Sequence, residues 1–205
     1  QFPPHKHPES ANWESLFKAD LSNAIYSKDI WSFDDGILTA TGDGVIFTRK
    51  DYNNFMLDLE FKLGEKANSG VFVYTTDVEN WIPNSVEVQI LDDHAAAKVP
   101  SVVSCGSVFG HLAPDKSKVK KPGKWNHMTV SCKDQMIYVV LNNEPVLEFN
   151  MAKYTSSKVN PDGSKIFSWL SKPKAEMPTK GKIGLQGKHG EGEIYFRNVK
   201  VNEIQ

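Results

Sequence analysis

NSGVFVYTTDVENWIPNSVEVQILDDH, residues 68–94, is the stretch that decides the fold. Its second half contains Val86-Glu87-Val88-Gln89-Ile90, in which apolar and polar residues alternate. Successive side chains of a strand point to opposite faces, so the three apolar residues share one face while Glu87 and Gln89 share the other. The apolar face predicts contact with a core. The polar face presents a carboxylate beside an amide and predicts a functional surface.

The same alternation occurs along much of the chain and predicts an all-β fold. Residues 57–63 (LDLEFKL) have the pattern of a half-buried antiparallel strand. The Asp34-Asp35-Gly36 stretch between apolar residues predicts a hairpin, and Asn142-Asn143 predicts a second turn. Residues 193–201 change phase near Arg197-Asn198, which predicts a bulge. Roughly a dozen short strands without a long helix are typical of a sandwich of two antiparallel sheets.

Length and composition limit the class of protein. A chain of 205 residues with 40% hydrophobic and 24% charged residues is expected to form one globular domain. The net charge of −1 argues against nucleic acid as a partner. We also expect no transmembrane segment, because no apolar run is long enough. Cys105 and Cys132 are too few for a disulfide scaffold; buried thiols are the favoured interpretation and a disulfide is the alternative.

The predicted organisation is an N-terminal tail over residues 1–10 and a single sandwich domain over residues 11–205. The tail contains His5 and His7, a pair that resembles a metal chelate, but a solvated linker is the favoured interpretation. Residues 151–180 form a long loop with four Pro or Gly residues, and such loops are often lids or binding loops. The chain starts at Gln1 without a methionine, which is consistent with a processed or trimmed precursor.

Candidate site residues come from the polar faces of strands, because the sequence contains none of the common phosphate, zinc or nucleophile-elbow motifs. They are Glu87, Gln89, Gln186, His189 in a Gly-flanked turn, and Arg197 in the last strand. A solvated sheet face is the competing interpretation, although Glu and Gln are less favoured in strands than Thr, Val or Tyr.

Three aromatic residues lie in or beside predicted loops: Tyr74, Trp81 and Trp169. A flat ring can stack on the C–H face of a sugar, so these residues are candidates for a binding platform. The alternative is that they complete the edge of the core.

Five motifs appear in an order that resembles a known family. They are N-S-G-V-F (68–72), E-V-Q-I-L-D (87–92), G-K-W-N (123–126), I-G-L-Q-G-K-H-G (183–190) and F-R-N-V-K-V (196–201). Over residues 13–204 the chain is similar to the DUF1080 family, also called the 3-keto-disaccharide hydrolase domain. The resemblance implies a concanavalin A-like jelly-roll sandwich. It also implies a periplasmic or secreted bacterial protein that acts on carbohydrate, with a lipid anchor on a removed N-terminal signal as one option.

Retaining glucanases of this fold carry E-x-D-x-x-E or E-x-D-x-E on one strand, and this sequence departs from that pattern. Gln89 occupies the Asp position, and a regular strand would point Glu87 and Asp92 to opposite faces. Direct displacement needs two carboxyl groups flanking one glycosidic bond, so we do not expect that mechanism.

The resemblance implies a different reaction, in which the ketone of a 3-keto sugar acidifies the C2 proton and allows elimination followed by hydration. In this hypothesis Glu87 or His189 is the base, while Arg197 and Gln186 bind the enolate or a hydroxyl group. Asn68 and Gln89 are assigned as ligands of sugar hydroxyl groups.

Three alternatives stay open at this point. A divalent cation held by Glu87, Asp92 and His189 would replace the Arg197 clamp. A non-catalytic, lectin-like module would use the same face without a working base. A partner-binding domain would share only the sandwich. The oligomeric state is not predicted.

Overall fold

Strands with alternating apolar and polar residues supply most of the regular structure of the protein. The structure is a computed structural model, which describes residues 2–95 and 99–205. The strands are β1 (Glu14–Ser15), β2 (Ala24–Ile25), β3 (Trp31–Asp34), β4 (Ile37–Ala40), β5 (Val45–Thr48), β6 (Phe55–Leu63), β7 (Asn68–Thr75), β8 (Val86–Leu91), β9 (Trp125–Lys133), β10 (Met136–Leu141), β11 (Glu144–Asn150), β12 (Lys182–Gln186) and β13 (Ile194–Glu203). Two 3₁₀-helices, η1 (Met151–Lys153) and η2 (Lys174–Glu176), follow β11. Within these described ranges no helix has the length and apolar character needed to cross a bilayer.

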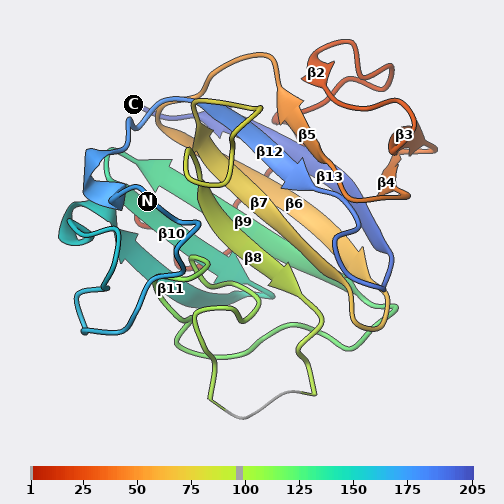
Figure 1. Cartoon of the computed structure of the whole chain (residues 1–205). Coiled ribbons are helices and arrows are strands. Elements are labelled where there is room, and N and C mark those ends of the chain that lie inside the picture. The colour runs from red at the N-terminus through yellow and green to blue at the C-terminus, as the bar shows by residue number, and fades with distance from the viewer. Residues whose placement is uncertain (1, 96–98) are drawn as a thin grey trace.

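The strands form two antiparallel sheets, as Figure 1 shows. The eight-stranded sheet has the order β11-β10-β9-β6-β13-β4-β3, and β1 pairs with β13. The five-stranded sheet has the order β2-β5-β12-β7-β8. Neighbours such as β6 and β13 are distant in sequence, as the crossing connections of a jelly-roll sandwich require. The predicted all-β sandwich is confirmed.

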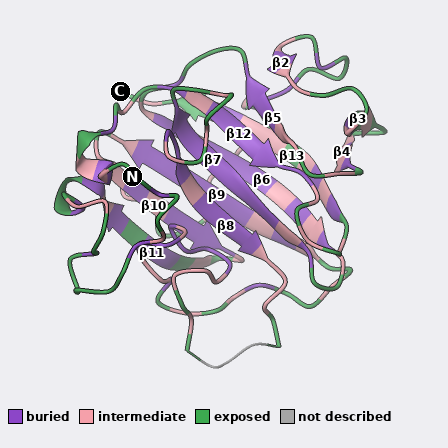
Figure 2. Cartoon of the chain, viewed as in Figure 1, coloured by how far each residue is buried: buried purple, intermediate pink, exposed green. Residues whose placement is uncertain are grey.

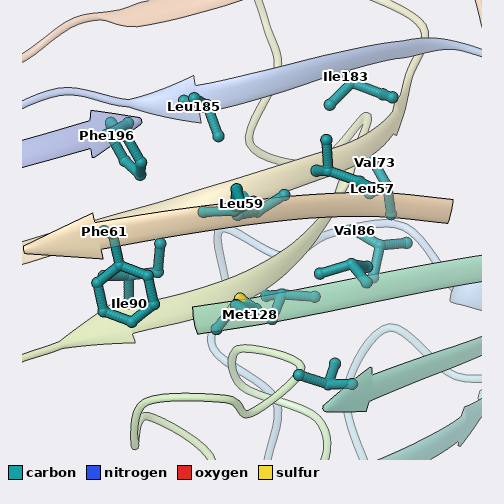
Figure 3. Close-up of a cluster of buried hydrophobic side chains, with 14 of the residues drawn as sticks. Leu57, Leu59, Phe61, Val73, Val86, Ile90, Met128, Ile183, Leu185 and Phe196 are labelled. Atoms are coloured by element: carbon teal, nitrogen blue, oxygen red, sulfur yellow. The ribbon is translucent and has the colours of Figure 1, made fainter. Parts of the chain in front are cut away.

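The core lies between the two sheets and follows the alternation in the sequence. Leu57, Leu59 and Phe61 of β6 are fully buried, and Figure 3 shows them among apolar side chains from both sheets. Buried and partly exposed residues alternate along several strands in Figure 2. Cys105 and Cys132 are buried and free, as the favoured interpretation of the sequence expected.

The predicted turns have the backbone that their residues favour. Asp35 and Gly36 have φ of 49° and 76°, which suits the two-residue hairpin between β3 and β4. Asn142 and Asn143 have φ of 50° and 68° between β10 and β11. Both turn predictions are therefore confirmed.

The predicted bulge in β13 is also present. The pairing of β13 with β6 changes register between Arg197 and Lys200, and Asn198 has a φ of 50°. The extra residue brings Phe196 and Val201 onto the same buried face.

The N-terminal segment is packed on the outer face of the eight-stranded sheet. The ring of His7 stacks on that of His127 with centroids 3.5 Å apart, and its side chain is 7% exposed. The backbone N–H of Asn143 donates to Nε2 of His7 over 3.0 Å. Phe2 makes an edge contact with Tyr138 at a centroid distance of 5.1 Å. The expectation of a solvated linker is wrong, because stacking and hydrogen bonds hold this segment.

The long connection over residues 151–180 is anchored rather than extended into solvent. Ile166, Leu170 and Lys174 are buried. The side-chain amide of Asn160 donates to the Gly110 carbonyl over 3.1 Å. This connection, called here the 151–180 segment, therefore packs against the loop that follows β8.

Candidate functional site

A pocket of about 300 Å³ opens on the outer face of the five-stranded sheet. Strands β7, β8 and β12 form its floor, and loops form its walls. It is lined by Asn68, Trp81, Ile82, Glu87, Gln89, Phe109, Trp169, Leu170, Gln186 and His189. Apolar walls with a few polar groups on the floor are typical of a small-molecule site, and this volume suits a ligand the size of a monosaccharide.

Most of the predicted site residues meet in this pocket. Those that the structure brings together are Asn68, Trp81, Glu87, Gln89, Trp169, Gln186 and His189. Their roles stay predictions, but their common location is a property of the fold. The alternation in residues 86–90 correctly separated the core-facing side chains of β8 from those that line the pocket.

Arg197 is not part of the pocket, which corrects the expectation that it would serve as an enolate clamp there. It belongs to β13 of the eight-stranded sheet, on the other side of the core. Its Nε and Nη2 donate to the two carboxylate oxygens of Glu60 over 3.0 and 2.9 Å. Its guanidinium lies 4.0 Å from the ring centroid of Trp125. Alternation shows which side of a strand is polar, but it does not show to which sheet the strand belongs.

Tyr74 is also displaced from its predicted role as a sugar platform. Its side chain is fully buried, and its hydroxyl group donates to the Asp134 carbonyl over 3.0 Å. A φ of 57° breaks the regular strand at this residue. The local backbone therefore turns the ring into the core, where it makes an edge contact with Phe55.

Glu87 has the environment of a tuned acid or base. Burial raises the pKa of its carboxyl group to about 8, although the Lys174 ammonium acts in the opposite direction. Gly70 on neighbouring β7 provides room for the carboxylate, because a Cβ there would lie 2.3 Å from Oε1 of Glu87. A group that changes charge near pH 8 can take and return a proton under physiological conditions.

The raised pKa of Glu87 predicts a pH-dependent stability. Between its ordinary value of 4.5 and the folded value of about 8, the folded protein binds more protons than the unfolded chain. The free energy of unfolding therefore falls as pH rises through this window. We expect the stability of Glu87→Gln relative to that of the wild type to increase between pH 4.5 and pH 8, by on the order of 2 kcal/mol. Urea unfolding from pH 4.5 to 8 measures this; a constant difference over that range would contradict it.

His189 is held by an aspartate that the sequence did not reveal. Its Nδ1 lies 2.8 Å from Oδ2 of Asp43. An ionised carboxylate only accepts hydrogen bonds, so Nδ1 carries a proton toward Asp43, and Nε2 is the nitrogen left to release or take up the proton used in a reaction. The turn with Asp43 is joined to the end of β12 by a hydrogen bond from the Gly187 N–H to the Gly44 carbonyl over 2.8 Å. An Asp between glycines is also an ordinary turn residue, so nothing in the sequence separated the two roles.

Two amide side chains are hydrogen-bonded to each other at the floor of the pocket. Nε2 of Gln89 donates to Oδ1 of Asn68 over 3.3 Å, and Gln89 is almost fully buried. The Asn68 nitrogen and the Gln89 oxygen are then available to hydroxyl groups of a ligand. Gln186, which is nearly buried, adds a third amide to the lining.

Aromatic and aliphatic side chains form the walls. Trp169 is 53% exposed, and its ring stacks on that of Phe167 with centroids 4.8 Å apart and a 2° angle between planes. Trp81 packs on Phe72, with centroids 4.5 Å apart. Ile82, which sequence analysis did not single out, is 40% exposed at the rim. Indole rings at the edge of a polar floor suit the mixed surface of a sugar.

The three expected cation ligands do not come together. Glu87 and His189 line the pocket, but Asp92 does not. Its Oδ2 accepts a hydrogen bond from the Lys66 backbone over 2.9 Å, and its Oδ1 lies 2.9 Å from Nδ1 of His94. The structure therefore does not support the predicted cation site.

A second cavity, of about 610 Å³, lies on the eight-stranded sheet beside His7, Asp58 and His127. The ligand atoms of these residues lie within 4.8 Å of one another. However, His7 donates to Thr129 over 2.8 Å and accepts from Asn143, while His127 binds Asp58 over 2.8 Å. A metal ion lies near the plane of each imidazole that binds it, and these stacked rings share no plane. The trio fits a hydrogen-bond network better than a metal site.

Comparisons with known proteins agree with this fold. A family model described as a 3-keto-alpha-glucoside-1,2-lyase-like domain matches residues 11–202. A 3-keto-disaccharide hydrolase of Bacteroides thetaiotaomicron is 25% identical over 206 residues, covering 85% of this chain and 70% of that protein.

Two solved structures illustrate the range of similarity. A provisionally named glycosyl hydrolase of Parabacteroides distasonis ATCC 8503 is 52% identical with a TM-score of 0.89, and the match covers 94% of this chain and 100% of that chain. The carbohydrate-binding module CBM66 of Bacillus subtilis is 11% identical with a TM-score of 0.56, covering 91% of this chain and 99% of that chain. The second likeness shows the concanavalin A-like sandwich alone.

Proposed function

We propose, because the chain belongs to the 3-keto-alpha-glucoside-1,2-lyase-like domain family, that it cleaves the glycosidic bond of 3-keto glycosides by elimination followed by hydration. One observation carries this proposal. Burial raises the pKa of the Glu87 carboxyl group to about 8, and this group lines a sugar-sized pocket together with His189, whose imidazole is oriented by Asp43.

The reaction needs one base and one acid. The C3 ketone acidifies the C2 proton, and the ionised Glu87 carboxylate removes it to form an enolate. The C3 carbonyl then re-forms, a C1–C2 double bond appears, and the C1–O bond breaks. His189 supplies the proton to the leaving oxygen. Water then adds its oxygen to C1 and a proton to C2, so the net change is hydrolysis.

The enolate oxygen requires hydrogen-bond donors, and Arg197 is too far away to provide them. The amide nitrogens of Gln186 and Asn68 line the pocket and can take this role. Two neutral amides stabilise an anion less than a guanidinium does. The proposal therefore relies on a substrate whose ketone already makes C2 acidic, rather than on an ordinary glycoside.

A matched pair of substrates tests the reaction. Each 3-keto glucoside is compared with the ordinary glucoside of the same aglycone, and release of the aglycone is measured. We expect turnover of the 3-keto compound alone, and a slower rate when C2 carries deuterium. Equal cleavage of both compounds would point instead to direct displacement and would overturn the elimination mechanism.

A sugar-binding module is the second candidate. The feature that favours it is that the amides and indoles of the pocket suffice for binding, whereas Glu87 is the only carboxyl group among its described lining residues. Calorimetry with the same substrate pair separates the two functions. Binding without turnover, in protein shown to be folded, would establish the module.

Trp169 should contribute to substrate affinity. Its ring is half exposed at the rim, so Trp169→Ala should raise KM about 10-fold by loss of a stacking surface and leave kcat within about 3-fold of the wild type. Steady-state kinetics on a 3-keto glucoside measure both constants. Trp169→Phe should retain most of the affinity. Val159→Ala, at an exposed residue of the same segment, is the control and should change neither constant.

A periplasmic or secreted location is part of the same proposal. It rests on the resemblance of the sequence to bacterial carbohydrate-active proteins. Fractionation of the native host, followed by detection of the protein with an antibody, tests it.

A further inference from the structure

We propose that Lys174 is a positioning residue whose buried ammonium is the counter-charge for Glu87. The 151–180 segment would then supply both a wall of the pocket, through Trp169, and the charge that permits its acid to ionise. This inference deepens the proposed function and rests on it, because it concerns the ionisation of the same carboxyl group.

Lys174 is buried to an unusual degree for a lysine. Its side chain is 2% exposed, and its Nζ donates to the Ser85 carbonyl over 2.9 Å. Ser85 stands two residues before Glu87, immediately before β8. A buried ammonium normally requires a charged partner, and one neutral carbonyl does not balance its charge. The position of the ammonium beside the first residues of β8 makes Glu87 the candidate partner.

The electrostatic effects of the two groups are mutual. Burial lowers the pKa of Lys174 to about 8, the Glu87 carboxylate raises it, and Lys172 lowers it further. The Lys174 ammonium is in turn the charge that opposes the effect of burial on Glu87. The two groups therefore titrate in the same pH range and should be treated as a coupled pair. Loss of one proton from a neutral acid and an ammonium leaves two opposite charges.

Other charged groups near this pair do not replace Glu87. Lys172 has the same charge as Lys174, and its Nζ donates to Oδ1 of Asn84. His111 is buried, and burial lowers its pKa to about 4, with Lys174 acting in the same direction. It is therefore neutral where the pair titrates. Among the described groups that affect the pKa of Lys174, Glu87 is the one anion.

The sequence of the 151–180 segment links two functions. Trp169 lines the pocket wall, and Lys174 follows it by five residues in the same segment. The backbone hydrogen bond from the Leu170 N–H to the Phe167 carbonyl, 3.0 Å long, closes the turn that contains Trp169. A displacement of this segment would remove the platform and the counter-charge together.

The test is a direct titration of the Glu87 carboxyl group without substrate. The protein carries ¹³C-labelled glutamate, and the resonance that is missing in Glu87→Gln identifies the group. We expect Lys174→Met to raise the midpoint by at least about one pH unit, because it removes the opposing charge. Lys174→Arg keeps a charge and should hold the midpoint at or below that of the wild type. Lys165→Met, at an exposed lysine of the same segment, is the matched control and should leave the midpoint unchanged.

An unchanged midpoint in folded Lys174→Met would overturn the proposal. If that variant does not fold, the reciprocal measurement takes its place. Coupling is symmetric, so Glu87→Gln should lower the titration midpoint of ¹³C-labelled Lys174 by a similar amount. An unshifted lysine in Glu87→Gln would overturn the proposal equally.

These measurements use no substrate, so their outcome is independent of turnover. If the pair is coupled but no 3-keto glycoside is cleaved, the proposed function fails and the counter-charge stands. If the compounds are cleaved but the midpoints do not move, the function stands and the role of Lys174 fails. With both correct, the rising limb of the pH–kcat/KM profile moves to higher pH in Lys174→Met.

Discussion

Glu87→Gln is expected to lower kcat for a 3-keto glucoside by about 10³-fold, within the range that general acid–base catalysis contributes. Glutamine has nearly the same shape but cannot accept the C2 proton. The hydrogen-bonding amides and the indole walls stay in place, so KM should remain within about 3-fold of the wild type. Steady-state kinetics with stopped assays of aglycone release measure both constants.

Two comparisons make this result specific. Glu148→Gln changes an exposed glutamate on β11 of the other sheet and should leave both constants unchanged. His189→Ala should slow departure of the leaving group, with a smaller loss for aglycones that are good leaving groups. A fully active Glu87→Gln combined with an inactive His189→Ala would assign the base to His189 instead. The wild-type kcat/KM should rise with pH up to about 8, where Glu87 becomes ionised.

Gly70→Ala is expected to reduce kcat about 100-fold, because displacement of a reacting group by about an ångström can cost that much. The added Cβ would lie 2.3 Å from Oε1 of Glu87, so the carboxylate must move. Gly70 has no positive φ, so alanine suits its extended backbone. Kinetics should therefore show a much larger effect than urea unfolding, in which we expect a loss of about 1 kcal/mol.

A double variant tests whether the steric contact is the cause. In Glu87→Ala the space beside residue 70 is empty, so adding Gly70→Ala should cost almost no further stability. The two substitutions should then be non-additive by at least about 0.5 kcal/mol. Additive losses would show that Gly70→Ala acts through the strand backbone rather than through Glu87.

The sequence predicted the fold and the face of β8 because both follow from a local rule. Val86, Val88 and Ile90 are buried, while Glu87 and Gln89 form part of the pocket floor. A side-chain period of two needs no knowledge of the rest of the chain. The family motifs then brought in residues from β7 and β12, which are adjacent to β8 in the sheet order.

The wrong predictions have a common physical cause. They depend on which strands and loops pack together, and a local sequence pattern does not contain that information. Arg197 has the polar phase of its strand, but β13 pairs with β6 and β4 in the opposite sheet. Tyr74 has the polar phase too, but its left-handed backbone conformation turns the side chain toward the core. Asp43 and Lys174 lie outside any periodic pattern. Only the packing of their loops brings them to His189 and Glu87.

The single carboxyl group of the described pocket also bears on mechanism. Direct displacement requires two carboxyl groups across one glycosidic bond, and Asp92 is engaged with Lys66 and His94 instead. In the proposed mechanism Glu87 and the Asp43–His189 pair supply one base and one acid. This set matches an elimination, in which the ketone of the substrate provides the remaining activation.

The attachment of the N-terminal segment has a practical consequence for engineering the protein. His7 connects a turn and a strand of the eight-stranded sheet, and Phe2 packs on Tyr138. An affinity handle fused directly before Phe2 would compete with these contacts, and a nickel-binding tag would add imidazoles beside His7. Gln205 is exposed, so purification handles, surface immobilisation and fluorescent labels are better placed at that end.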